Sequence, residues 1–397
     1  MPLDPLWIPT GAGSQLLHDL CSDLDAAVTP LTTGAGIQAA FDADRENGRR
    51  MELGVGEITY TSTITRARSG GGIFGKGRPE PLAIDSALLG LGSTLIYHGT
   101  KAGSEAAIET EGTDLILRDC NFAGKSTADV RNDTGTRTPR GLHINRGASL
   151  GAGKVEAYNN RWSGFVNAIV AGEDMADLNC DESHWISQFS HKNGTFFQAR
   201  NAQCLGHRFW GLRVDQTDTV FDYKGGGKLS VRDCDILSET TLLHLDGTDP
   251  DGFGQNFSKW NFDTIEFDSG ARNSRLLTCT DDDFFGANIN FRGVQLSTND
   301  VTGWDNEVLT VGENMIVQLE DCTNLPAGAI RWKTTSNKSI LFIRNCRVWT
   351  DVSAVTDLLD YGNSDGNLRV IVELCFQHNT YTLLNGGTFY NEIAVGT

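Results

Sequence analysis

One short pattern recurs along the chain and constrains its fold more than any other feature of the sequence. Two apolar residues, separated by one position, are followed two positions later by Asp or Asn, then by a small residue that is often Cys, and then by another apolar residue. Copies occur at residues 115–122, 229–236, 317–322 and 341–348. A unit that returns in this way predicts a repeat protein, in which each unit packs against its neighbours.

Cys120 provides an anchor for aligning the copies. The equivalent positions that we assign are Asn160, Ser183, Ala202, Cys234, Ile265, Val294, Cys322, Cys346 and Cys375. Most are separated by about 20–30 residues, which is the length of one coil of a β-solenoid with turns of variable length. The long first interval is accounted for by an insertion at residues 125–140, which is rich in Thr, Arg and Asp.

A second strand pattern precedes the anchor in most coils. It occurs at residues 142–145, 221–224, 243–246, 277–280, 309–312, 330–333 and 359–362. Each coil therefore has two recognisable short strands, and successive coils are expected to stack about 4.8 Å apart with equivalent residues in ladders. Inward positions then hold Cys, Val, Leu and Ile, and outward positions are available for chemistry.

A β-sandwich is the rival architecture, but it gives no reason for one motif to repeat with Cys in one place.

The composition agrees with an all-β chain and excludes several classes of function. The 397 residues include 45 Gly but only 9 Pro and 4 Met, which suits short strands joined by tight turns. A net charge of -18 argues against a nucleic-acid partner, because phosphate binding needs clustered Lys and Arg. No run approaches the roughly 18 apolar residues of a membrane span, and the N-terminus does not resemble a signal peptide.

The 9 cysteines show neither a disulfide framework nor the spacing of a zinc site. Cys120, Cys234, Cys322 and Cys346 share one position of the repeat, which suits a small buried side chain. We therefore expect free thiols and assembly in a reducing cytosol.

Three regions are expected along the chain. Residues 1–33 form an N-terminal arm, in which residues 14–27 have the apolar spacing of a short amphipathic helix. Residues 34–390 form the β-solenoid, which begins with a second helix at residues 32–44. Residues 391–397 form a C-terminal tail.

The start of the second region resembles a known family. A Gly-x-Gly turn at residues 34–36, the Ile-Gln-Ala-Ala helix that follows, a strand at residues 51–64, the glycine-rich residues 70–77 and residues 93–99 are similar to the opening of the pectate-lyase-like right-handed β-helices. The resemblance is greatest to the tailspike and tail-fibre proteins of bacteriophages. It implies a right-handed parallel β-helix of about ten or more coils, with a helix that caps the open end. The Asp-Asp-Thr that is common before the capping helix in this family is absent here.

The outward positions of the second strand carry the best catalytic candidates. Asp222 and Lys224 lie one coil before His244 and Asp246 in this pattern. Carboxylates on neighbouring coils have separations that glycosidic hydrolysis can use, about 5.5 Å for retention or 6.5–9.5 Å for inversion, and His244 could act as an acid or base. Asp222, His244 and Asp246 are therefore the catalytic candidates, although a solvated polar sheet face would carry the same residue types.

Aromatic and basic residues on the outward side are candidates for sugar binding. Proteins hold sugar rings by stacking them on an aromatic ring and by hydrogen bonds. Trp210, Arg213 and Lys224 are the candidates, whereas Trp162 and Trp185 align with the core position of Phe122.

One acidic run could hold a metal ion. Asp281, Asp282 and Asp283 follow one strand, and further Asp residues follow the equivalent strand one coil earlier. Stacked carboxylate loops suit Ca²⁺, which takes six to eight oxygen ligands. The pattern requires no cofactor, and Asp residues are also common in turns.

Two functions from different classes follow from the fold and the resemblance. The first is a virion component of tailspike or tail-fibre type, which assembles in the host cytoplasm, acts outside the cell and binds host-surface polysaccharide. The resemblance implies that such a protein is a homotrimer and contacts other virion proteins, here through residues 1–33. The second is an active polysaccharide depolymerase, a hydrolase or a lyase, that uses the three catalytic candidates. Neither function involves nucleic acid or membrane insertion.

Overall fold

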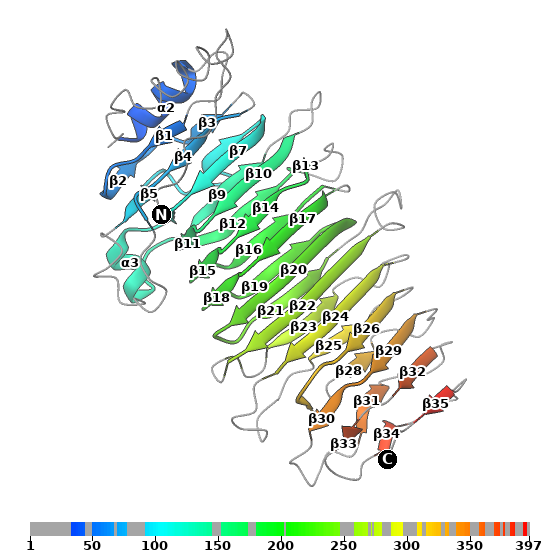
Figure 1. Cartoon of the computed structure of the whole chain (residues 1–397). Coiled ribbons are helices and arrows are strands. Elements are labelled where there is room, and N and C mark those ends of the chain that lie inside the picture. The colour runs from blue at the N-terminus through cyan, green and yellow to red at the C-terminus, as the bar shows by residue number, and fades with distance from the viewer. Residues whose placement is uncertain are drawn as a thin grey trace, which may run out of the picture.

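The described part of the chain is almost entirely β-strand (Figure 1). A computed structural model describes residues 33–43, 50–66, 70–77, 92–144, 152–173, 180–201, 204–246, 258–268, 271, 274–279, 287–296, 308–311, 315–326, 330–332, 339–349, 357–361, 369–373, 376–377, 382–385 and 392–394. Within these residues there are two helices, α2 (Gly34–Ala43) and α3 (Thr127–Asn132). The helix predicted at residues 14–27 and the acidic residues 281–283 lie outside the described residues.

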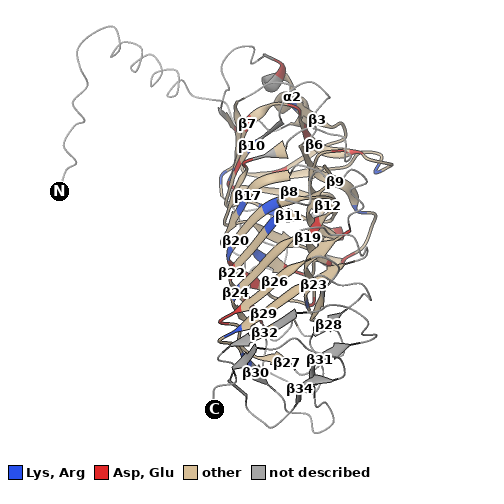
Figure 2. Ribbon diagram, turned by 90° about the vertical axis from the view of Figure 1, so that its right-hand side faces the viewer, with Lys and Arg blue, Asp and Glu red and all other residues tan. Residues whose placement is uncertain are grey.

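Parallel strands stack into two long sheets that run along an elongated body and a third, short sheet near its C-terminal end (Figures 1 and 2). The first, 20-stranded sheet contains β1 (Arg50–Glu52), β2 (Gly56–Tyr60), β4 (Gly72–Phe74), β5 (Ser93–Tyr97), β7 (Thr113–Arg118), β8 (Cys120–Ala123), β10 (Ala152–Tyr158), β11 (Arg161–Ser163), β13 (Cys180–Asp181), β14 (His184–Ile186), β15 (Phe189–His191), β17 (Cys204–Trp210), β18 (Arg213–Asp215), β20 (Gly227–Ile236), β22 (Lys259–Phe267), β24 (Asn288–Gln295), β26 (Ile316–Glu320), β29 (Ile340–Arg344), β32 (Arg369–Glu373) and β35 (Glu392–Ala394). The second, 12-stranded sheet contains β3 (Ile64–Arg66), β6 (Ala106–Thr110), β9 (Thr138–Ile144), β12 (Phe165–Ala171), β16 (Thr195–Ala199), β19 (Thr219–Tyr223), β21 (Thr241–Leu245), β23 (Arg275–Cys279), β25 (Leu309–Val311), β28 (Ile330–Trp332), β31 (Asp357–Tyr361) and β34 (Thr382–Asn385). The third contains β27 (Leu325–Pro326), β30 (Arg347–Trp349) and β33 (Phe376–Gln377). The prediction of an all-β chain that forms a right-handed parallel β-helix is confirmed.

The Asp or Asn of the repeat makes a sharp corner in each coil. Asp119, Asn159, Asp233, Asp321 and Asn345 all have a φ between 49° and 55°, in the left-handed region. Most residues avoid this conformation because Cβ approaches the carbonyl oxygen, but Asp and Asn tolerate it through local hydrogen bonds. The repeat therefore reflects a requirement of the backbone. In each coil a strand ends in a left-handed corner, a buried residue follows, and a new strand begins in another direction.

Parallel pairing places most of the assigned anchor positions in one ladder. Cys234 pairs with Ile265, and Ile265 pairs with Val294. The assignments of Ser183 and Ala202 are wrong, because the positions in register in those two coils are Gln188 and Leu212. These coils have no Asp or Asn at the corner, where Ser187 and Gly211 adopt the left-handed conformation instead.

The interior is filled by stacked apolar ladders that include large aromatic rings. Trp162 pairs with Phe122 as expected, and the two rings stack with centroids 4.3 Å apart. Trp185 is also fully buried, but it pairs with Ala157 and Phe209 and so occupies a different ladder from the one predicted. The described cysteines, Cys120, Cys180, Cys204, Cys234, Cys279, Cys322 and Cys346, are all buried and free. Burial raises the pKa of the Cys120 thiol far above its usual range.

Helix α2 covers one end of the stack. Its Ile37 is fully buried, and Gly34 approaches Tyr60 so closely that a Cβ would lie 2.2 Å from the Tyr60 Cβ. The Gln38 side chain binds strand β3, since Oε1 accepts from the Thr65 N–H at 2.8 Å and Nε2 donates to the Thr65 carbonyl at 3.2 Å. An amide side chain thus satisfies backbone groups that an end strand would otherwise leave open to pairing.

The insertion at residues 125–140 contains α3. Ser126 caps its N-terminus by accepting from the Asp129 N–H, and Asp133 ends it in the left-handed conformation. Among the described residues, neither helix is long and apolar enough to cross a membrane.

The left-handed corner predicts which substitution stabilises the fold. Thr264 occupies the corner position of its coil with a φ of 59°, although its branched Cβ makes that conformation costly. Replacement by Asn, the residue found at two other corners, is expected to raise the free energy of unfolding by about 1 kcal/mol. Chemical denaturation measures this change.

The same substitution at Thr278, within the extended strand β23, serves as the control. Asn is unfavourable in strands, so Thr278→Asn is expected to be neutral or destabilising. Equal effects of Thr264→Asn and Thr278→Asn would contradict the role of the corner.

Candidate functional site

The catalytic candidates meet on the outer face of the second sheet. Asp222 of β19 is paired with His244 of β21, and its Oδ1 accepts from the His244 Nδ1 at 2.8 Å. The other carboxylate oxygen accepts from the Gln198 amide of β16 at 2.7 Å. With both oxygens engaged, Asp222 fixes the orientation of the imidazole and leaves its Nε2 for another partner. This is the arrangement of a general base held by a carboxylate.

Asp246 and Lys224 form a second pair beside the first. The Lys224 ammonium donates to the Asp246 carboxylate, and the Asp246 N–H donates to the Tyr223 carbonyl at 2.9 Å, which keeps Asp246 in the ladder. Asp222 and Asp246 are one coil and two residues apart. The spacing of strands and residues in a parallel sheet places their Cα atoms about 8 Å from each other. The four predicted residues are therefore brought together, with Asp222 6% exposed and the His244 side chain 24% exposed.

These residues belong to a longer polar column, which we call the acid–histidine column. It contains, in order, Glu109, His143, Val170, Gln198, Asp222, His244 and Thr278. Gln198 was not predicted, although Phe197 and Ala199 flank it with the apolar alternation of the second strand pattern. His143 does occupy the same position of that pattern as Asp222 and His244, so its place in the column could have been read from the sequence.

A second charged cluster surrounds His143. Its Nδ1 lies 3.6 Å from Glu109 Oε1, and its Nε2 lies 3.2 Å from Glu173 Oε2. Arg140 binds Glu173 through both terminal nitrogens, and this hydrogen bonding lowers the pKa of the Glu173 carboxyl. The described residues thus place two acid–histidine pairs on one face, at opposite ends of the column.

Trp210 lies on a different face, the outer side of the first sheet. Its side chain is 59% exposed, and its indole N–H donates to the corner residue Asp233 at 2.6 Å. Arg213 lies beyond the corner at Gly211, on β18, and pairs with Phe189 and Asp235. Trp210, Arg213 and Lys224 are therefore on three different faces and do not form one site.

Trp210 is part of a column of charged residues, which we call the arginine column. It contains Arg118, Tyr158, Ile186, Trp210, Arg232, Asp263, Arg292, Glu320, Arg344 and Glu373. Arg118, Arg232 and Arg344 therefore share one ladder. Arg292 binds Asp263 at 3.0 and 2.6 Å, which lowers the pKa of that carboxyl. Basic and acidic residues alternate along the later part of the column, in the order Arg232, Asp263, Arg292, Glu320, Arg344 and Glu373.

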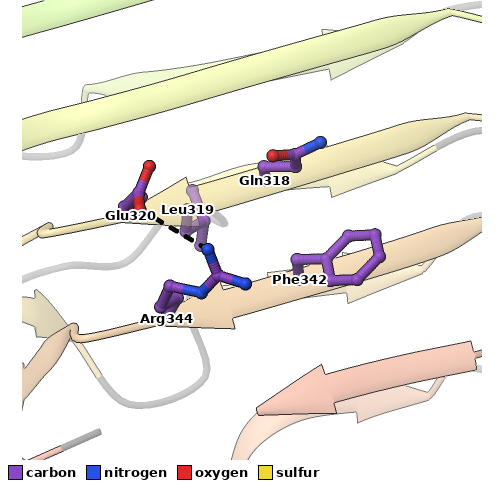
Figure 3. A pocket seen from close by; sticks show the side chains of 5 residues that line it. All are labelled: Gln318, Leu319, Glu320, Phe342 and Arg344. Carbon is purple, nitrogen blue, oxygen red and sulfur yellow. Dashed lines mark ion pairs between the residues drawn. The ribbon is translucent and has the colours of Figure 1, made fainter. Parts of the chain in front are cut away.

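A pocket opens beside the lower end of the arginine column (Figure 3). It has a volume of about 140 Å³ and is lined by Gln318, Leu319, Glu320, Phe342 and Arg344. The Arg344 Nη1 lies 3.7 Å from Glu320 Oε1, and both side chains are about half exposed. Phe342 pairs with Gln318 on the neighbouring strand, so an aromatic ring and an amide lie side by side. Sequence reasoning missed this pocket, because Phe342 reads as one more apolar residue of the repeat.

The predicted metal ligands, Asp281, Asp282 and Asp283, cannot be placed, since they lie outside the described residues. Within the described ranges, no group of three or more His, Cys, Asp or Glu side chains could hold a metal ion. The Ca²⁺ site therefore stays a prediction.

Comparisons with known proteins bear on the fold. No protein-family model matches the sequence, and no curated protein matches it. Among solved structures, the A-module of the mannuronan C-5 epimerase AlgE6 from Azotobacter vinelandii is similar over 93% of this chain and 98% of that one, with a TM-score of 0.50 and 11% identity.

Two proteins of viruses are also similar, at TM-scores below 0.5. ORF18 of Geobacillus virus E2 has a TM-score of 0.45 and 10% identity, over 94% of this chain and 66% of that one. The tailspike gp49 of the Acinetobacter baumannii bacteriophage Fri1, described as a capsular polysaccharide depolymerase, has a TM-score of 0.43 and 11% identity, over 93% of this chain and 61% of that one. The chain thus spans less than two thirds of the length of either viral protein. From its strand pairing and its likeness to the epimerase module, this chain has the fold of the right-handed parallel β-helices.

Proposed function

We propose that the protein binds a polysaccharide along the outer face of the first sheet, as a surface component of a virion. The observation that carries the binding proposal is the pocket at Phe342. An aromatic ring beside an amide, a guanidinium and a carboxylate offers both the stacking surface and the hydrogen-bonding groups that hold a sugar ring. The assignment to a virion rests on the resemblance of residues 34 to 125 to tailspike and tail-fibre proteins.

The rest of the same face supports an extended ligand. Trp210 and Arg344 are separated by five steps of the arginine column, or about 24 Å. Beside that column, Asn261 and Asn290 form an amide ladder, with the Asn290 Nδ2 donating to Asn261 Oδ1 at 2.8 Å. Amides and exposed guanidinium groups suit the hydroxyl and acidic groups of a polysaccharide chain.

Depolymerisation is a second candidate function, favoured by the geometry of Asp222 and His244. The Asp222 carboxylate orients the imidazole, and Asp246 supplies a second carboxylate one coil further on and two residues along the strand. A His oriented in this way could equally remove a proton in a lyase reaction. Binding on the first sheet does not depend on this second activity.

Removal of the aromatic ring tests the binding face. Phe342→Ala is expected to weaken binding to the capsule or lipopolysaccharide of a responsive host about tenfold, because a stacking contact is lost. Calorimetry or a glycan-binding assay measures the change. Phe342→Trp keeps a ring and should retain binding, and Val55→Ala, at a 66% exposed apolar residue elsewhere, is the surface control. Unchanged binding by Phe342→Ala would contradict the proposed site.

A product assay tests the second function. Incubation with host polysaccharide should release new reducing ends or unsaturated sugars, and Asp222→Asn should lower the rate by about 100-fold or more, since the imidazole loses its orienting partner. Thr278→Ala, at the next position of the acid–histidine column, should keep the activity. Release of no product from any host polysaccharide would exclude the depolymerase, and full activity of a double Asp222→Asn, Asp246→Asn variant would exclude this site.

The proposed virion role also predicts the oligomeric state. We expect a homotrimer, so light scattering of the full chain should give about three times the monomer mass of 43.1 kDa. A stable monomer at micromolar concentration would argue strongly against a tailspike or tail fibre.

A further inference from the structure

A serine, a histidine and an aspartate occupy one outward column on three successive coils. Ser163 of β11 pairs with His191 of β15, and His191 pairs with Asp215 of β18. Their neighbours in the same strands, Trp162 and Val214, point into the core, so the three side chains point to the outer face. This column lies on the short strands between the corner and the second sheet, and it includes none of the residues in the two sites described above.

We propose that Ser163, His191 and Asp215 form a hydrolytic triad that cleaves an ester bond, such as the bond to an O-acyl group on a sugar. Asp215 Oδ2 lies 3.0 Å from His191 Nδ1, so the carboxylate fixes the ring through one nitrogen. Ser163 lies on the opposite neighbouring coil, about 4.8 Å away along the stack. The order serine, imidazole, carboxylate therefore matches the order of proton transfer in such a triad.

The surroundings of His191 suit a general base. Burial lowers the pKa of its imidazole, the Asp215 hydrogen bond opposes this shift, and the charges of Arg161 and Lys192 reinforce it. With a lowered pKa the ring is neutral near pH 7 and can accept a proton from a hydroxyl. His191 is 1% exposed and Asp215 is 6% exposed, so their hydrogen bond is shielded from water.

Helix α3 covers this column. A Cβ on Gly164, the residue after Ser163, would lie 3.0 Å from the Lys125 Cγ and 3.3 Å from the Val130 Cγ2. On the next coil, the Nζ of Lys192, the residue after His191, donates to the Val130 carbonyl at 3.0 Å. The helix thus rests on the residues that follow both the serine and the histidine, and Ser163 is only 2% exposed.

Helix α3 itself buries little apolar surface among its described side chains. Val130 is its one buried apolar residue among those whose side chains are described. Asp133 pairs with Lys125 at 3.4 Å, and Arg137 pairs with Asp218 at 3.5 Å, but Asp133 and Asp218 are 52% and 77% exposed. The Arg137–Asp218 pair is exposed and contributes little to stability, and Val130 is one apolar side chain, so opening of this cover should need less free energy than unfolding of a coil.

The reaction conserves atoms and charge, with water as the only co-reactant. Ser163 Oγ bonds to the acyl carbon while His191 Nε2 takes its proton, and the ester C–O bond then breaks as that proton passes to the leaving alcohol. A water molecule, deprotonated by the same nitrogen, releases the acyl group as a carboxylic acid and restores Ser163. This activity goes beyond polysaccharide binding, because it needs neither the pocket at Phe342 nor the acid–histidine column.

A fluorophosphonate probe and p-nitrophenyl acetate test the triad on the full chain. We expect the probe to modify Ser163, as identified by peptide mass spectrometry, and p-nitrophenyl acetate to be hydrolysed. Ser163→Ala should reduce both reactions to background, and His191→Asn should lower them about a thousandfold. Val130→Ala, which loosens α3, should speed up labelling. Ser230→Ala, at an outward serine of another face, should change neither reaction.

Labelling of the wild-type chain does not depend on how any variant folds. Absence of label on Ser163 in both the wild-type and the Val130→Ala protein would overturn the triad. Label at Ser163 whose rate is unchanged in a folded His191→Asn protein would overturn the role of His191. Either result would leave the proposal of polysaccharide binding untouched, since that is measured with Phe342→Ala.

Discussion

The in-register parallel pairing of each coil with the next is the constraint on which the rest of this structure depends. Because pairing repeats at every coil, a residue type that suits the backbone conformation at one position of a coil also suits the same position of other coils. The left-handed corner is the clearest case: Asp119, Asp233 and Asp321 fill it in separate coils. The buried position that follows takes Cys in some coils, such as Cys234, and a larger apolar residue in the next two, Ile265 and Val294. The core is therefore a set of ladders. A substitution in one coil mainly changes the packing of the two neighbouring coils.

The same pairing organises the outer surface into faces with distinct chemistry. The corner after Trp210 separates the arginine column from the short strands that carry Ser163 and His191. The second sheet then presents the acid–histidine column, with Asp222 and His244 towards one end and His143 towards the other. Each coil adds one side chain to each column, so a site is built across several coils and extends along the molecule. Such a surface suits an extended ligand better than a compact one.

The repeat was sufficient to predict a β-solenoid, and the family resemblance added its right-handed parallel form. The repeat also brought Asp222 and His244 together, because both residues occupy the same position of a recognisable strand pattern. It failed in the coils of Gln188 and Leu212, where the corner uses Ser or Gly and the motif is not visible. Coil lengths also vary, so an error at one corner shifts the assignment of the next strand. The contacts of Glu173 with Arg140 and of α3 with Lys192 could not be predicted, since they depend on how turns and an insertion fold back over the coils.

Distances between spin labels on the arginine column test the coil stacking most directly. Arg118, Arg232 and Arg344 have exposed side chains and can be replaced by Cys in pairs, while the described native thiols are buried and should not take the label. Eight steps separate Arg118 from Arg344 and four separate Arg232 from Arg344, so pulsed electron paramagnetic resonance should give distances of about 38 Å and about 19 Å. Distances in a ratio near two, each with a narrow distribution, are the predicted result. Distances that do not scale with the number of coils would contradict the ladder, and with it every site built upon it.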